Sequence, residues 1–137
     1  MMVLWFLMLG CMEQSAPHRS LPTFPTITLR ANQKEYIVEY ACTPHEVALG
    51  LRYRKLHVDE GVLLCSEKGS SLSMQKMKDP ISVAFLSKEK EIISIESFLL
   101  STPEYPIDDA VRWIWEMPKG WFSQKQIEPG MRIEGIP

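Results

Sequence analysis

Three charged residues stand in largely apolar stretches of the chain and are the first candidates for chemistry. Arg54 and Glu60 flank a predicted polar turn, and Glu116 alternates with apolar residues in a late strand-like run. One interpretation is a small polar binding site, and the other is a structural ion pair or turn contact. We favour the structural interpretation, because charges held away from water need partners for stability alone.

Two tryptophans, Trp113 and Trp115, fall on one face of that late run, because side chains alternate along a strand. If the face is exposed they can stack on sugar rings, but such a stripe more commonly belongs to the hydrophobic core. The candidate ligand-binding residues are therefore Arg54, Glu60, Glu116, Trp113 and Trp115.

Familiar catalytic motifs are absent from the sequence. His45 and Glu46 begin a zincin-like pattern, but the second histidine is missing. There is no glycine-rich phosphate loop and no Gly-x-Ser-x-Gly elbow. A glycosidase needs two carboxyl groups at a defined separation, and the sequence identifies no such pair. We therefore predict no catalytic residue, no metal ligand and no cofactor.

The cysteines leave one question open. Three of them are too few for a disulfide-rich scaffold or a four-ligand zinc site. Cys65 lies on a predicted apolar strand, where a buried, inert thiol is the usual outcome. In an oxidising compartment, Cys42 and Cys65 are also candidates for a disulfide. Their spacing does not say whether their Cα atoms come within about 7 Å, as a disulfide requires.

Composition sets outer limits on the fold and its partners. The 137 residues fit one domain, and a hydrophobic content of 45% argues against a disordered chain. With 15 Lys and Arg against 17 Asp and Glu, the net charge is −2. We therefore expect no nucleic-acid partner, since phosphate binding needs a clustered excess of basic side chains.

The apolar segment at residues 1–10 is too short to cross a bilayer, which takes about 20 apolar residues, and is typical of a secretory signal. Met8-Leu9-Gly10-Cys11 resembles the lipobox of bacterial lipoproteins, with Cys11 as the lipidated residue. Met8 replaces the usual leucine, and no Lys or Arg precedes the run. An ordinary export signal or a hydrophobic N-terminal strand are the alternatives. Residues 11–25, rich in proline and polar residues, are predicted to be a tether.

The remaining residues, 26–137, are expected to form a mainly β sandwich or partly closed barrel. Period-two alternation predicts strands at 26–30, 36–40, 81–85 and 111–117. A short apolar run predicts a strand at 61–65, and a turn at 87–90 predicts that 92–95 pairs with 81–85 as a hairpin. In the last run, Val111, Trp113, Trp115 and Met117 are expected to share a face.

One main helix is signalled by Thr43-Pro44-His45-Glu46, which supplies an N-cap, a first-position proline and a capping box. It is expected to end near Arg54. A second, short helix is expected near Pro118, with Trp121 and Phe122 in its first turns.

Taken in order, these landmarks resemble domain-of-unknown-function family 192, an uncharacterised bacterial and archaeal family, over about residues 27–135. The matching segments are Val38–Ala41, Thr43–Glu46, Gly50–Arg54, Leu56, Asp59–Leu64, Trp113–Trp121 and Ile127–Gly130. The resemblance implies a compact, mostly β domain in proteins that are often exported or lipid-anchored, and it supplies no reaction. The chain resembles a divergent member, because Leu72–Val83 keeps Met74 and Pro80 but replaces the Trp, Lys, Asn, Thr and Asp of the family's central signature.

We therefore expect an exported, lipid-anchored protein of the cell envelope that acts as a non-enzymatic binding or assembly module. An envelope protein or a glycan is the expected ligand. The alternative is a small carbohydrate-active or hydrolytic domain that uses Glu60 or Glu116.

Overall fold

The computed structural model describes residues 23–137 and confirms the predicted mainly β fold. Its main sheet has six strands in the order β1-β2-β3-β8-β5-β6 and does not close into a barrel. These strands are β1 (Thr26–Ala31), β2 (Lys34–Ala41), β3 (Val62–Cys65), β5 (Ile81–Ser87), β6 (Ile92–Phe98) and β8 (Val111–Pro118). The expected signal segment, Cys11 and most of the expected tether lie outside the described residues. Within residues 23–137, no helix has the length and apolar character needed to span a bilayer.

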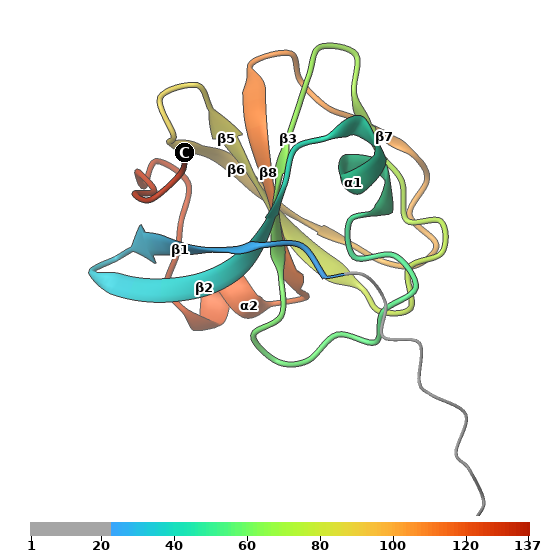
Figure 1. Ribbon diagram of the computed structural model, residues 1–137, viewed down its shortest axis with the longest axis horizontal. Helices are drawn as coiled ribbons and strands as arrows, with labels where there is room; N and C mark the ends of the chain where they lie inside the picture. The colour runs from blue at the N-terminus through green and yellow to red at the C-terminus, as the bar shows by residue number, and fades with distance from the viewer. Residues whose placement is uncertain (1–22) are drawn as a thin grey trace, which may run out of the picture.

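The sheet, drawn in Figure 1, has a hydrophobic core on each of its two faces. One face is covered by α1 (Pro44–Leu49) and by the two-stranded ribbon of β4 (Ser71–Leu72) and β7 (Tyr105–Pro106). The other face is covered by α2 (Trp121–Gln124) and the C-terminal segment. Alternation along the strands supplies both cores, so every residue of β5 from Ile81 to Leu86 is buried.

The C-terminal segment spans the gap between the two ends of the sheet. The backbone of Arg30 in β1 forms an isolated antiparallel β-bridge with Glu134. The backbone of Glu91, next to β6, forms another with Arg132. The ammonium of Lys90 also donates to the carbonyl oxygen of Ile136 at 3.0 Å. These contacts occupy backbone groups that would otherwise be open to another strand.

Helix α1 begins as predicted, with a complete capping box. The hydroxyl of Thr43 accepts from the N–H of Glu46 at 3.3 Å, and the Glu46 carboxylate accepts from the N–H of Thr43 at 3.2 Å. The expectation that the helix continues to near Arg54 was wrong. It ends at Leu49, because Gly50 takes a positive φ of 45° that a continuing helix does not allow.

Strand β8 follows the expected alternation except at its start. Trp113, Trp115 and Met117 share the face toward α2, whereas Val111 packs into the core on the α1 side. The expectation that Val111 shares the tryptophan face was wrong because the register shifts. Leu86 of β5 pairs with Trp113 while the next residue, Ser87, pairs with Val111, so a β-bulge reverses the side-chain direction.

Candidate functional site

The five residues singled out from the sequence do not form one site. Arg54 and Glu60 belong to an ion-pair cluster, Glu116 lines a pocket beneath α1, and Trp113 and Trp115 lie on the opposite face of the sheet. The structure therefore separates the candidate polar groups from the candidate stacking platform.

Arg54 is held mainly by Glu39, a residue of β2 that sequence reasoning did not select. The two side chains form an ion pair, and both residues are more than nine-tenths buried. The Nη1 atom of Arg54 lies 3.4 Å from Glu60 Oε1. Glu39 Oε1 also accepts from the N–H of Phe24 at 2.6 Å, and the guanidinium lies 5.5 Å from the Phe24 ring centre. The cluster ties the start of the folded domain to β2 and to the segment after α1.

The carboxylates of this cluster are largely occupied by these contacts. Glu60 Oε2 accepts from the backbone N–H of His57 at 3.0 Å, which fixes the turn before β3. The signal for Glu39 was its position on β2, where alternation places it on the same face as the buried Ala41. A charged residue at such a position needs a buried partner.

The tryptophans contribute to the core on the α2 side. Trp115 is fully buried, and its ring packs edge-on against Phe122 with 5.0 Å between ring centres. Trp113 is partly buried against the same cluster. Trp115 therefore presents no surface on which a sugar ring could stack.

A cavity of about 220 Å³ lies between α1 and the sheet. Its walls are mainly apolar and come from α1, β3, β4, β5 and β8, including Val47, Leu64, Leu72, Ile81 and Ile114. Pockets for drug-sized molecules measure roughly 300–1,000 Å³, so this cavity suits a smaller molecule.

Glu116 provides the one carboxyl group among the residues that line this cavity. The residue is 7% exposed, and its side chain makes no hydrogen bond or ion pair with any residue from 23 to 137. Burial raises the pKa of Glu116 to about 7, and the positive charge of Arg52 opposes that rise. A carboxyl group that is largely removed from water and has no protein donor is suited to accept a hydrogen bond from a ligand.

The strand register explains why Glu116 differs from Glu39. Glu116 of β8 and Glu39 of β2 both pair with Val62 of β3, which lies between them. The two carboxylate residues therefore lie two strands apart on the same face of the sheet. That separation corresponds to roughly 10 Å between backbones. Arg54 compensates Glu39, whereas Glu116 faces the apolar cavity.

A second, more polar cavity of about 420 Å³ adjoins the first. Arg52 and Ser73 line both cavities, and Gln75, Thr102 and Glu104 line only the second. Arg52 therefore lies at the junction of the apolar cavity and the polar cavity.

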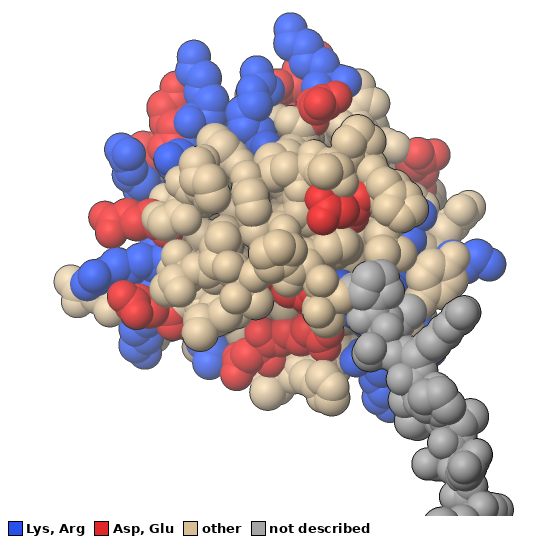
Figure 2. All heavy atoms as spheres, in the orientation of Figure 1, with Lys and Arg blue, Asp and Glu red and all other residues tan. Residues whose placement is uncertain are grey.

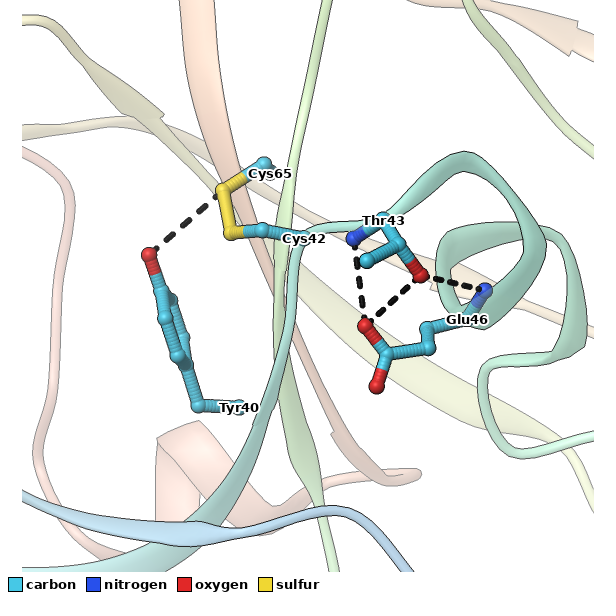
Figure 3. Close-up of a disulfide and its surroundings, with 5 residues drawn as sticks. All are labelled: Tyr40, Cys42, Thr43, Glu46 and Cys65. Atoms are coloured by element: carbon cyan, nitrogen blue, oxygen red, sulfur yellow. Dashed lines mark hydrogen bonds between the residues drawn. A yellow bond between two sulfur atoms is a disulfide. The ribbon is translucent and has the colours of Figure 1, made fainter.

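Cys42 and Cys65 form a disulfide with their Cα atoms 4.8 Å apart. Figure 3 shows this bond beside the capping box of α1, with the Tyr40 hydroxyl 3.6 Å from Cys65 Sγ. Cys65 also lines the apolar cavity. The pairing that the sequence spacing left open thus fixes the start of α1 next to the pocket.

Neither a cluster of metal-ligating side chains nor the surface in Figure 2 adds another site among residues 23–137. Among residues 23–137, no group of three or more His, Cys, Asp or Glu side chains is placed to hold a metal ion. On the face in Figure 2, acidic and basic side chains mix around the rim, and uncharged side chains fill the centre. That face therefore lacks the continuous basic surface typical of nucleic-acid binding.

Comparisons with known proteins agree with this fold. The family DUF192, described as "Uncharacterized ACR", matches residues 27–135. A putative transcription regulator from Sinorhizobium meliloti 1021 is 21% identical with a TM-score of 0.75, covering 85% of this chain and 98% of that one. A protein of unknown function from Novosphingobium aromaticivorans DSM 12444 is 20% identical with a TM-score of 0.67, covering 80% and 83%. No curated protein matches the sequence significantly.

Proposed function

The chain belongs to the uncharacterised family DUF192, and from this starting point we propose that it is an exported, lipid-anchored module that binds a small ligand in the cell envelope. The observation that carries the binding role is Glu116, a buried carboxyl without a protein partner in the apolar cavity beneath α1. In a protein interior, such a group costs stability unless something donates to it. A ligand that donates a hydrogen bond to Glu116 removes this cost, and the stability regained contributes to the affinity of the cavity for that ligand.

Export is supported by two independent features. The Cys42–Cys65 disulfide is typical of proteins that fold in an oxidising compartment such as the periplasm. The lipobox-like Met8-Leu9-Gly10-Cys11 supplies an export signal and an anchoring residue. A lipid at Cys11 would hold the domain at the membrane surface through the segment that precedes Phe24.

Hydrolysis is the second candidate function, and the raised pKa of Glu116 favours it. A carboxyl whose pKa is about 7 is suited to act as a general acid near neutral pH. Glycosidases pair this group with a second carboxyl. Glu60 is engaged by Arg54 and by the N–H of His57, and it does not line the cavity. The second carboxyl would therefore have to come from a residue outside the cavity lining.

Binding is tested by screening small-molecule mixtures against the isotope-labelled full chain and mapping amide shifts by NMR. We expect ligands to shift the amide resonances of residues in α1, β3 and β8. Ala48→Trp, which adds a bulky side chain at the α1 wall of the cavity, should abolish these shifts. His45→Trp is the matched control, because His45 is exposed on the same helix and does not line the cavity.

Three results would count against a binding site in this cavity. The site would lie elsewhere if ligands shifted the amide resonances of other surfaces. The same would follow if they bound Ala48→Trp as tightly as wild type. Turnover of esters or glycosides that Glu116→Gln abolishes would establish the hydrolytic alternative instead.

A further inference from the structure

The apolar cavity contains two opposite charges. Of its lining residues, Arg52 and Glu116 are the ones that carry charge. Arg52 is partly exposed at the junction with the polar cavity, whereas Glu116 is almost fully buried. A ligand that satisfies both must itself carry a donor or positive group and a negative group.

The rest of the lining sets the size and polarity of the ligand. Most of the wall is aliphatic, with Leu49, Leu64 and Ile114 among its members. An engineered apolar cavity of about 150 Å³ accommodates benzene, so about 220 Å³ accommodates a side chain somewhat larger than that ring. The ligand therefore needs an apolar part of the size of a leucine or phenylalanine side chain.

We infer that the ligand is an apolar α-amino acid or a close zwitterionic analogue, with its ammonium at Glu116, its carboxylate at Arg52 and its side chain in the cavity. This inference rests on the proposed binding function. An ammonium provides three N–H donors and a positive charge, which compensate the unpartnered carboxyl. A guanidinium provides the planar pair of donors that a carboxylate accepts.

A ligand with only one of these charges leaves the other charged side chain unsatisfied. An apolar carboxylic acid pairs with Arg52 but brings a second negative group toward Glu116. An apolar amine pairs with Glu116 but leaves Arg52 without an anion from the ligand. The zwitterion avoids both costs, because a buried charge that gains a partner no longer carries its full desolvation penalty.

Three probes with the same branched carbon chain separate these possibilities: L-leucine, isoamylamine and 4-methylpentanoate. Isothermal titration of the purified full chain should give the tightest binding with L-leucine. We expect isoamylamine to bind at least tenfold more weakly and 4-methylpentanoate to be weakest of the three.

Two variants assign the charges. Glu116→Gln should weaken L-leucine and isoamylamine at least tenfold, and Arg52→Gln should weaken L-leucine while leaving isoamylamine within about threefold of wild type. Glu35→Gln and Arg132→Gln are matched controls at exposed positions outside the cavity. Circular dichroism melting of each variant verifies that it remains folded.

Each remaining outcome has one meaning. If 4-methylpentanoate binds as tightly as L-leucine and Glu116→Gln changes neither, the zwitterion inference is overturned. If none of the three probes binds but the mixture screen finds cavity ligands, the ligand class is wrong and the binding module stands. If both experiments find no ligand in the cavity, the proposed function fails as well.

Discussion

At the scale of single residues, Glu116 links the pocket to the pH dependence of folding. Burial raises its pKa from 4.5 to about 7. Between pH 4.5 and pH 7 the folded state therefore keeps a proton that the unfolded chain has already released. Folding stability therefore falls as pH increases through this window. Above pH 7 the cost approaches about 3 kcal/mol, since each pKa unit corresponds to about 1.4 kcal/mol.

We expect Glu116→Gln to remove this dependence, because glutamine has no proton to release. Urea unfolding between pH 4.5 and 8 should show that its stability declines less than that of wild type, with the largest gain at pH 8. Glu35→Gln, at an exposed position, should follow the wild-type profile. Parallel curves for Glu116→Gln and wild type would contradict the assigned burial.

Arg54 has the opposite role, since it compensates carboxylates. Arg54→Ala leaves Glu39 buried without its guanidinium partner, and we expect a loss of about 3–5 kcal/mol in the free energy of unfolding. Lys55→Ala, at the exposed neighbouring position, should change stability by less than about 0.5 kcal/mol. Chemical denaturation measures both, and equal small losses would show that the cluster is not a structural ion pair.

Sequence reasoning located some charged residues but not their partners. Arg54 and Glu60 stand out because they interrupt apolar stretches, and the structure does bring them together. Glu39 and Arg52 were missed, because the segment after α1 packs against the sheet and brings Arg54 to Glu39 and Arg52 to the cavity, and no local pattern specifies that packing. The partner of a buried charge comes from the topology of the sheet.

At the scale of elements, the capping box of α1 is local and was therefore predictable. Thr43→Ala removes the acceptor for the Glu46 N–H, and we expect a destabilisation of about 1 kcal/mol. Thr26→Ala, at an exposed position of β1, is the control for loss of a threonine hydroxyl. Urea denaturation decides the matter, because an unchanged midpoint for Thr43→Ala would mean that the cap contributes nothing to α1.

The disulfide stabilises the same region of the fold. Cys42→Ser with Cys65→Ser opens a loop of sequence separation 23 and should lower the free energy of unfolding by about 3 kcal/mol. Amide hydrogen exchange should accelerate most in α1, which the bond joins to β3. Wild-type protein treated with reductant should match the double variant. A uniform change across all strands would contradict this local role.

Some elements left no clear pattern in the sequence. β4 and β7 each contain two residues, which is too short for alternation to be recognised. The direction of Val111 depends on a bulge, and the end of α1 depends on the φ of Gly50. Long alternating strands and capped helix starts are local signals, whereas short ribbons and bulges are imposed by packing.

At the scale of the whole molecule, the pocket lies where three separate parts of the chain meet. These parts are helix α1, the ribbon strand β4, and the sheet strands β3, β5 and β8. The C-terminal segment and α2 fill the opposite face, so that side forms a closed core. Both faces of the sheet thus carry a hydrophobic core, and the α1 face also holds the cavity.

The proposed lipid anchor at Cys11 is testable on the whole molecule. If Cys11 is lipidated, residues 1–10 are removed and the segment before Phe24 becomes the link to the bilayer. One acyl chain binds a membrane only marginally, so stable anchoring needs the several chains that bacterial lipoproteins carry. Cys11→Ser should therefore abolish palmitate labelling and move the protein out of the detergent phase, while Cys42 and Cys65 remain paired in protein that is still exported. Met12→Ala is the control that keeps the lipidated cysteine. Equal labelling and equal partition of Cys11→Ser and wild type would refute the lipid anchor and leave an ordinary export signal or a structural N-terminus.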